Sequence, residues 1–325
     1  MVCCRRWIYE GVMMSDRKII IAVPHGFCAG VSRAIETVEK VLEKFPSETV
    51  YVLHEVVHNQ HVVDDLRQKG VVFTDCLADI PENSIVVFSA HGVSADVEEL
   101  ARMRNLRVYD ATCPIVDRVH RKVRRLSSQG EEVIMIGHAG HQEVVGTLGQ
   151  YNSEAGGIYL VVNHHDIENL KVKNPAKLSF VTQTTLSVDE TAATIRELQS
   201  CFPGIQGPGL NDICYATQNR QRAVKELAKK ADVVLVVGSR NSSNSNRLRE
   251  VAEHEGAKAF LINDYTELLP EMITGYRVIG ITGGASAPEY LLKDLVRELR
   301  NFGYEDIEEL GVSTEKQKFR LPGDL

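Results

Sequence analysis

Three cysteines that lie far apart in the chain each follow a hydrophobic run and precede an amphipathic helical pattern. They are Cys28, Cys113 and Cys214, and the runs before them are Lys18–Val23, Leu106–Tyr109 and, less clearly, Gly209–Ile213. After each cysteine, apolar residues recur with the 3.6-residue period of one helix face. A thiol at a helix N-terminus meets unpaired N–H groups and the positive end of the dipole, which favours thiolate. Three cysteines in equivalent positions predict one shared ligand.

A similar unit of sequence recurs after each cysteine. The predicted helix is followed by a hydrophobic strand pattern that ends in polar residues, and a second such strand follows one helix later. The first strand ends carry His58, His141 and Ser242, and the second carry His91, Thr184 and Ser286. A repeat of roughly 85 to 100 residues is too long for a solenoid and fits three small α/β units.

The length of the chain agrees with several units, because 325 residues exceed what one hydrophobic core usually serves. We therefore expect an α/β protein of three similar small domains with mostly parallel sheets, arranged with pseudo-three-fold symmetry around a common centre. The expected domains are 17–112, 113–211 and 212–303, preceded by a loose extension over 1–16 and followed by a tail over 304–325.

Composition is that of an ordinary soluble globular protein, with 43% hydrophobic and 25% charged residues. The formal net charge of −7 argues against a general nucleic-acid or membrane surface. No apolar run approaches the roughly 20 residues that span a bilayer, and residues 1–16 lack the apolar segment of a signal peptide. Seven scattered cysteines, an odd number, argue against a disulfide framework. We expect a cytoplasmic protein.

Several chemically capable residues lack polar company in the sequence and are expected to have no role in a site. Cys76 and Cys201 lie near predicted turns, and two further cysteines lie in the N-terminal extension. His54 and His61 flank His58 on one segment and are expected to be structural, because a lone histidine at a strand end is more often a capping or surface residue.

The arrangement of the three cysteines favours an iron–sulfur cluster as their ligand. Structural zinc normally takes four protein ligands and often uses close CxxC pairs, which are absent at these positions. A 4Fe–4S cluster bound by three cysteines leaves one iron open to act on a substrate oxygen while the cluster supplies electrons. A binding or sensing module with structural zinc or a structural cluster stays open as an alternative.

The polar strand ends carry mostly neutral or switchable hydrogen-bond donors and one carboxylate. These residues are His58, His91, His138, His141, Glu143, Gln183, Thr184, Thr185, Ser242, Ser243, Asn244 and Ser286. A ring of such donors suits a polyanion such as diphosphate, helped by helix N-termini and protonated imidazole. The sequence lacks the GxxxxGK[ST] pattern, which excludes a P-loop nucleotide site.

Nine ordered motifs resemble the 4-hydroxy-3-methylbut-2-enyl diphosphate reductase family. They are PHGFCAGV (24–31), HEVVHN (54–59), FSAHGVS (88–94), DATCP (110–114), IGHAGHQE (136–143), TQTTLS (182–187), DICYAT (212–217), GSRNSSNSNRL (238–248) and TGGASAP (282–288). The match extends from about Ile19 to the C-terminus. The resemblance implies three α/β domains around an oxygen-sensitive 4Fe–4S cluster.

The resemblance also implies roles for individual residues. The implied cluster ligands are Cys28, Cys113 and Cys214. The implied substrate-binding residues are His58, His91, His141, Thr184, Ser242, Ser243, Asn244 and Ser286. Glu143 is implied as the proton donor, with Thr184 and His141 beside it. Three departures, His25, Gln142 and Gly283, replace residues common in the family and fall on none of these positions.

The reaction implied by the resemblance is reductive removal of the hydroxyl group from an allylic diphosphate, giving isopentenyl and dimethylallyl diphosphate. The open iron would bind the hydroxyl oxygen, and a ferredoxin or flavodoxin would supply the electrons. A non-redox iron–sulfur hydro-lyase or synthase of the quinolinate-synthase type is the alternative. The basic run Arg118–Arg125 is either an exposed helix face or a contact for an acidic electron donor.

Overall fold

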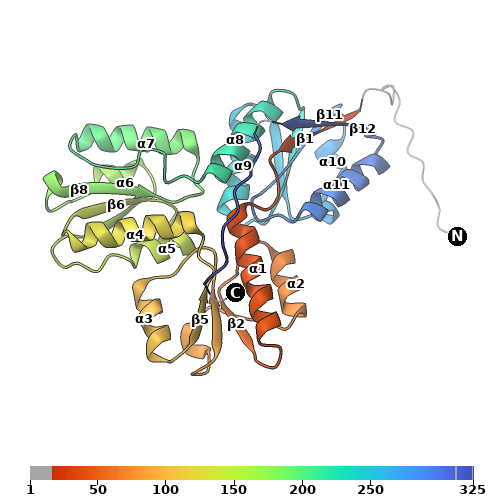
Figure 1. Cartoon of the computed structure of the whole chain (residues 1–325). Coiled ribbons are helices and arrows are strands. Elements are labelled where there is room, and N and C mark those ends of the chain that lie inside the picture. The colour runs from red at the N-terminus through yellow and green to blue at the C-terminus, as the bar shows by residue number, and fades with distance from the viewer. Residues whose placement is uncertain (1–16, 312, 324) are drawn as a thin grey trace.

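The computed structural model describes residues 17–311, 313–323 and 325, and these fold into three lobes (Figure 1). Each lobe has its own sheet, and every strand pair within the sheets is parallel. The expected α/β fold with three small parallel sheets is confirmed. Residues 1–16, with the first two cysteines, lie outside the described part of the chain.

The first lobe contains a four-stranded sheet in the order β3-β2-β4-β5. Its strands are β2 (Val50–Leu53), β3 (Val72–Thr74), β4 (Ile85–Phe88) and β5 (Arg107–Asp110). Its helices are α1 (Ala29–Lys44), α2 (Gln60–Gln68) and α3 (Ala95–Met103), with a 3₁₀ turn η2 (Leu77–Asp79).

The second lobe contains a three-stranded sheet in the order β7-β6-β8. Its strands are β6 (Glu132–Ile136), β7 (Ile158–Val161) and β8 (Leu178–Thr182). Its helices are α4 (Pro114–Ser128), α5 (Gln142–Leu148), α6 (His164–Glu168) and α7 (Val188–Cys201), with η3 (Pro175–Lys177).

The third lobe contains a five-stranded sheet in the order β10-β9-β11-β1-β12. Its strands are β1 (Lys18–Val23), β9 (Val233–Val237), β10 (Lys258–Ile262), β11 (Val278–Gly283) and β12 (Asp306–Gly311). Its helices are α8 (Tyr215–Ala228), α9 (Ser243–His254), α10 (Pro270–Ile273) and α11 (Glu289–Asn301), with η4 (Tyr265–Glu267).

Two strands cross the domain boundaries expected from the sequence. β1 was expected in 17–112 and β12 in the tail, but both belong to the third sheet, where they pair with each other. For β1, the reason is that the strand leading into a cysteine pairs with the strand whose end anchors that cysteine, as β5 pairs with β4 and β1 with β11. The run Gly209–Ile213 forms turns and not a strand, although Gln206 makes one parallel bridge to Ser179 of β8.

The core of each lobe lies on both faces of its sheet. Every residue of β4, β6, β8 and β9 is buried. This is expected of parallel strands whose sheet is covered on both faces. Separate clusters of buried side chains lie on the two faces of the first sheet and on the two faces of the third. None of the described helices is long and apolar enough to cross a bilayer.

The strand order places the polar strand ends together. In every lobe the chain moves outward from the first strand to an edge strand and then returns to the other side, giving β3-β2-β4, β7-β6-β8 and β10-β9-β11. Parallel sheets bind ligands outside the carboxyl ends of the two strands where this reversal occurs. The residues after β2 and β4, β6 and β8, and β9 and β11 therefore occupy the expected binding position of each lobe.

Candidate active site

The three cysteines predicted to share a ligand lie around one cavity. Cys28, Cys113 and Cys214 are the N-cap residues of α1, α4 and α8, are partly buried, and line a cavity of about 110 Å³. A Cβ atom on Gly30 would lie 2.7 Å from the Cys113 sulfur and 3.8 Å from the Cys28 sulfur. Two thiols thus converge on a backbone position that admits only glycine without displacement.

The backbone amide of each cysteine is anchored to a second polar strand end. The three hydrogen bonds run from Cys28 to the Ala285 carbonyl (3.1 Å), from Cys113 to the Ala90 carbonyl (3.0 Å) and from Cys214 to the Thr184 carbonyl (3.0 Å). Each of these carbonyl groups belongs to a residue just after a strand, and that strand lies beside the segment that leads into the cysteine. The same backbone contact, repeated three times, holds the thiols and the polar residues around one site.

The protonation of the thiols differs from the expectation. Burial, with a smaller contribution from nearby Cys28, raises the pKa of Cys113 to about 12 and that of Cys214 to about 11. The expectation of thiolates at helix N-termini is wrong for Cys113 and Cys214, because desolvation and repulsion between sulfurs outweigh the backbone N–H groups. A bound cationic centre reverses this balance, since it favours deprotonated sulfur.

The donor set fits an iron–sulfur cluster. Thiolates are the soft ligands that hold such clusters, and here they come from three separate helix N-termini around a space larger than one atom. Within the described residues, no three His, Cys, Asp or Glu side chains are arranged to hold a single metal ion.

Three histidines form a compact group on the wall of the same cavity. The rings of His58 and His91 stack with centroids 4.1 Å apart, and His141 meets them edge-on at 5.3 and 5.9 Å. The Nδ1 atom of His141 accepts the amide of Glu143 at 3.1 Å, which leaves the proton on Nε2. His58 Nε2 is buried without a partner among the described residues.

Two of these histidines, His91 and His141, have lowered pKa values and are neutral near pH 7. Burial lowers the pKa of His141 to about 3, and burial holds the pKa of His91 well below its ordinary value, with neighbouring histidines adding to both effects. The expected help from protonated imidazole is therefore not available from His91 and His141 themselves. Neutral imidazoles still donate one N–H each, and a bound polyanion would raise their pKa values.

Glu143 is buried in the cavity wall and is held by Thr184. The Thr184 amide donates to one carboxyl oxygen at 2.6 Å and its hydroxyl donates to the other at 2.9 Å. Burial raises the pKa of Glu143 to about 7, with the two Thr184 bonds acting against this rise and the nearby Asp212 carboxylate adding to it. A carboxyl group with a pKa near neutrality can deliver a proton at physiological pH.

The N-terminus of α9 supplies a second group of polar side chains. Ser242 is the N-cap, and its hydroxyl oxygen accepts the amide and hydroxyl of Ser245 at 3.3 and 3.1 Å. Asn244 is 4% exposed, and both its amide oxygen and its amide nitrogen lack a partner among the described residues. A buried unpaired amide beside the positive end of a 12-residue helix is suited to an anionic ligand.

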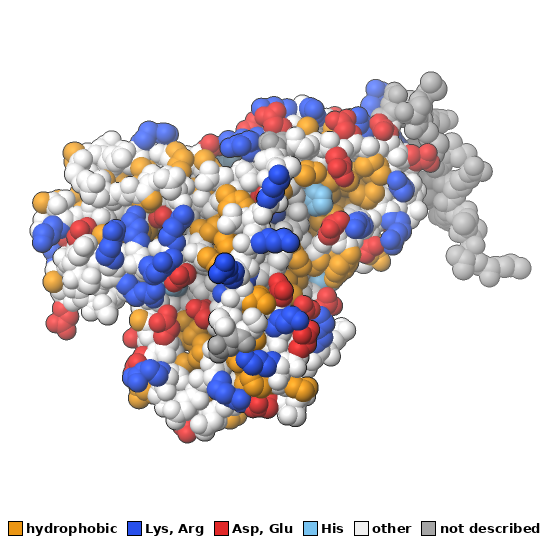
Figure 2. All heavy atoms as spheres, in the orientation of Figure 1, with side chains coloured by type: hydrophobic (Ala, Val, Ile, Leu, Met, Phe, Trp, Pro, Cys, Tyr) orange, Lys and Arg blue, Asp and Glu red, His pale blue; other side chains and the backbone are white. Residues whose placement is uncertain are grey.

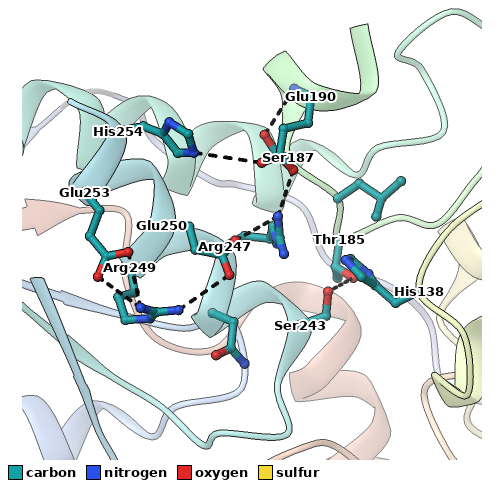
Figure 3. Close-up of polar contacts among 12 residues, drawn as sticks. His138, Thr185, Ser187, Glu190, Ser243, Arg247, Arg249, Glu250, Glu253 and His254 are labelled. Atoms are coloured by element: carbon teal, nitrogen blue, oxygen red, sulfur yellow. Dashed lines mark hydrogen bonds and ion pairs between the residues drawn. The ribbon is translucent and has the colours of Figure 1, made fainter. Parts of the chain in front are cut away.

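Hydrogen bonds across lobes fix the remaining residues. Ser286 in the third lobe donates to the His58 carbonyl in the first at 2.9 Å. Thr185 in the second lobe donates to Ser243 in the third at 3.1 Å, and Figure 3 shows His138 beside this pair. His138 itself bonds to Gln183, the neighbour of Thr184.

An ion-pair network joins the second and third lobes next to these contacts (Figure 3). Arg247 of α9 lies between Glu190 of α7 at 2.8 Å and Glu250 of its own helix at 2.7 Å. Arg249 continues the network to Glu250 at 3.5 Å. These pairs hold the start of α7 against α9, and so help to hold Thr185 near Ser243.

The structure brings together most of the residues predicted from the sequence to form a site. Those that line the cavity are Cys28, His58, His91, Cys113, His141, Glu143, Thr184, Thr185, Cys214, Ser242, Ser243, Asn244 and Ser286. His138 and Gln183 are not in its lining and bond to each other instead. His54 and His61 do not line it, and they bond to Asp75 and Asp264 instead, as expected of structural histidines. Cys76 and Cys201 are exposed elsewhere.

Sequence reasoning missed two aromatic residues of the cavity wall. Tyr215 follows Cys214 directly and lines the cavity, and adjacency to a proposed ligand was a usable signal. Phe319 also lines it from the C-terminal tail, about 100 residues downstream. The part of the tail beyond β12 has no helical or strand periodicity, so its path could not be read from the sequence.

Comparisons with known proteins agree with this geometry. A family model described as LytB protein matches residues 19–300. The chain is 54% identical over 308 residues to the 4-hydroxy-3-methylbut-2-enyl diphosphate reductase of Methylococcus capsulatus, covering 95% of this chain and 98% of that one. It is 55% identical over 307 residues to the Aeromonas hydrophila protein of the same name, covering 94% and 98%.

Solved structures show the same likeness. The E-1-hydroxy-2-methyl-but-2-enyl-4-diphosphate reductase of Plasmodium falciparum superimposes with a TM-score of 0.90 at 36% identity, covering 94% of this chain and 96% of that chain. A structure titled (E)-4-hydroxy-3-methyl-but-2-enyl diphosphate reductase, the terminal enzyme of the non-mevalonate pathway, gives a TM-score of 0.62 at 32% identity, covering 88% and 99%.

Proposed function

We propose that this chain, which belongs to the LytB family of 4-hydroxy-3-methylbut-2-enyl diphosphate reductases, performs that reduction in the cavity lined by its three cysteines. The reaction serves the non-mevalonate route to isoprenoids. The substrate gains two electrons and two protons, its allylic C–O bond breaks, water leaves, and a C–H bond forms at one of two carbons. The products are isopentenyl and dimethylallyl diphosphate.

Cys28, Cys113 and Cys214 are the residues that would hold a 4Fe–4S cluster. Their convergence from three helix N-termini on one cavity is the single observation that carries the proposal. When bound, such a cluster supplies electrons one at a time and an iron with an open position that polarises the substrate hydroxyl. Gly30 keeps the space beside two of the sulfurs clear.

The histidines and the start of α9 bind the diphosphate. The unpaired Asn244 amide, the Ser242 and Ser243 hydroxyls and the buried His58 Nε2 are donors or switchable groups on one cavity wall. His91 and Ser286 complete this wall, and Ser286 also ties it to the His58 backbone. Many fixed donors hold the anionic end so that the hydroxyl end faces the thiols and Glu143.

Glu143 delivers the proton. Its raised pKa keeps the carboxyl protonated near neutrality, and Thr184 fixes its orientation through two hydrogen bonds. His141 accepts the Glu143 amide, so its own N–H is directed elsewhere and can contact the substrate. Proton transfer by a positioned acid contributes on the order of 10² to 10⁴ in rate.

The electrons come from a small one-electron carrier such as a ferredoxin or flavodoxin, and the reaction takes place in the cytoplasm, where cysteines stay reduced. The three lobes serve as three domains that meet at the cysteines.

An anaerobic dye assay tests the proposal. Purified protein that contains its cluster should oxidise two molecules of reduced methyl viologen for each allylic diphosphate added. It should release isopentenyl and dimethylallyl diphosphate. A non-redox lyase would convert its substrate without consuming dye. Consumption of no dye by protein that contains intact cluster would overturn the proposed function.

A further inference from the structure

The C-terminal segment 313–323 crosses the molecule from the third lobe to the first, over the part that holds the thiols (Figure 1). We call this segment the strap. It follows β12 in the third sheet, and the terminal Leu325 packs on the core of the first lobe. Between these ends, Phe319 lines the cavity that the three cysteines line.

Two contacts fasten the strap to the helices that begin at cysteines. Arg220 of α8 is fully buried and pairs with Glu315 at 2.9 Å, and it also donates to the Gly26 carbonyl at 2.7 Å. Arg33 of α1 donates to the Arg320 carbonyl at 2.7 Å. The strap is therefore held across the starts of α1 and α8, where Cys28 and Cys214 lie.

The outer side of the strap is basic. Lys316, Lys318 and Arg320 are exposed, and their side chains make no ion pair with another described residue. The acidic Glu315 points inward and is neutralised by buried Arg220. Figure 2 shows Lys and Arg side chains along the path of the strap and over α4 on the same face. This is a local positive surface on a chain whose formal net charge is −7.

We propose that the outer face of the strap is the docking site of an acidic one-electron carrier protein. The proposal rests on the proposed function, which needs electrons delivered singly to the thiol-lined cavity. A carrier on this face would be separated from the cavity by the strap alone, because Phe319 belongs to both. Positive charge attracts an acidic partner, speeds its encounter and sets its orientation. Each carrier gives one electron, so two dockings reduce one substrate.

The basic face of α4 extends the same surface. Arg118, Arg121 and Arg125 are exposed on the helix that begins at Cys113. Arg118 is fixed by a hydrogen bond to the Asn211 carbonyl at 2.6 Å, and Arg121 is paired with Asp117 at 3.0 Å. Asp117 partly neutralises the positive charge of α4, so the cations of the strap attract an acidic partner more strongly.

The test compares two double charge reversals. Lys316→Glu with Lys318→Glu alters the strap, whereas Lys171→Glu with Lys177→Glu makes the same charge change near the amino end of β8, away from the cavity. Binding of reduced flavodoxin to the cluster-loaded enzyme is measured anaerobically at about 50 mM and about 500 mM salt, where screening differs strongly. Turnover with reduced methyl viologen is measured on the same samples.

At low salt, the affinity of the strap variant for flavodoxin should fall by about tenfold or more. The affinity of the remote variant should stay within about twofold of that of the unchanged protein. High salt should remove the difference between the two variants. Viologen-driven turnover should stay unchanged in both. Equal affinity of the strap variant and the unchanged protein, or equal loss in both variants, would overturn the docking site. Equally strong, strap-dependent binding of duplex DNA would also overturn it. Failure of the proposed function is separate, since the unchanged protein would then consume no dye.

Discussion

The backbone amide of Cys214 donates a hydrogen bond to the carbonyl oxygen of Thr184 at 3.0 Å. The amide and hydroxyl of the same threonine hold the carboxyl group of Glu143. One residue therefore fixes a proposed cluster ligand through its carbonyl and the proposed proton donor through its two hydrogen-bond donors. The placement of Cys214 relative to Glu143 is therefore set by a single residue just after β8.

Glu143→Gln should lower turnover by about 10² to 10⁴ while leaving cluster content and substrate affinity close to normal. The amide keeps an acceptor for the Thr184 amide and has no proton to give. Viologen-driven kcat, iron content and inhibition by inorganic diphosphate report the three properties separately. A near-normal kcat would show that another group supplies the proton.

The pH profile should follow the raised pKa of Glu143, which is about 7. The acid is protonated below this value and loses its proton above it, so kcat should be level at lower pH and fall about tenfold per unit well above pH 7. The profile is measured with saturating substrate and viologen. A kcat that rises through pH 7 would contradict a protonated Glu143 as donor.

Asp212→Asn should move that fall in kcat to lower pH. Asp212 is buried, and its negative charge raises the pKa of Glu143. Removing the charge lowers the Glu143 pKa, so the proton is lost earlier, while the asparagine oxygen can still accept the Thr182 amide. The same kcat profile checks this, and an unchanged or alkaline-shifted limb would be the opposite of the expected result.

Asn244→Ala should weaken diphosphate binding about tenfold, because it removes a buried amide that has no hydrogen-bond partner among the described residues. The KM for substrate and the inhibition constant of inorganic diphosphate should rise together. Asn241→Ala is the matched control, since Asn241 is exposed and bonds to Glu55 outside the cavity. Equal effects of the two substitutions would remove Asn244 from the binding wall.

Gly30→Ala should lower cluster content although alanine favours a helix. The new Cβ would lie 2.7 Å from the Cys113 sulfur, and a sulfur fixed as a ligand cannot move aside. Gly204→Ala is the control, because among the described residues no atom beyond its chain neighbours lies within 4 Å of the added Cβ. Iron per chain and thermal unfolding separate loss of the cluster from loss of the fold, and a full iron complement in Gly30→Ala would place the ligand elsewhere.

Much of the site could be predicted because its residues stand at the ends of strands. A hydrophobic run followed by polar residues marks the carboxyl end of a parallel strand, and His91, Thr184 and Ser286 all follow that pattern. Helix starts at the three cysteines were equally clear from periodicity, and the structure confirms them.

Pairing, burial and the tail could not be predicted from the same patterns. The sequence shows that β1 is a strand, but the choice of β11 as its neighbour depends on contacts about 260 residues away. The pKa of Cys113 depends on how deeply the lobes bury it, and local sequence reveals only its helix position. Phe319 is held at the cavity because the tail contacts Arg220 and Arg33. These long-range contacts leave no periodic pattern in the sequence.

The most direct test of the account is the iron and acid-labile sulfide content of single cysteine variants purified without oxygen. A 4Fe–4S cluster shared by the three cysteines predicts about four irons per chain in the unchanged protein. It predicts the same content in Cys76→Ser and Cys201→Ser, and strong loss in Cys28→Ser, Cys113→Ser and Cys214→Ser. A full complement of iron and sulfide in any of the last three would contradict the convergence of three thiols on one cluster.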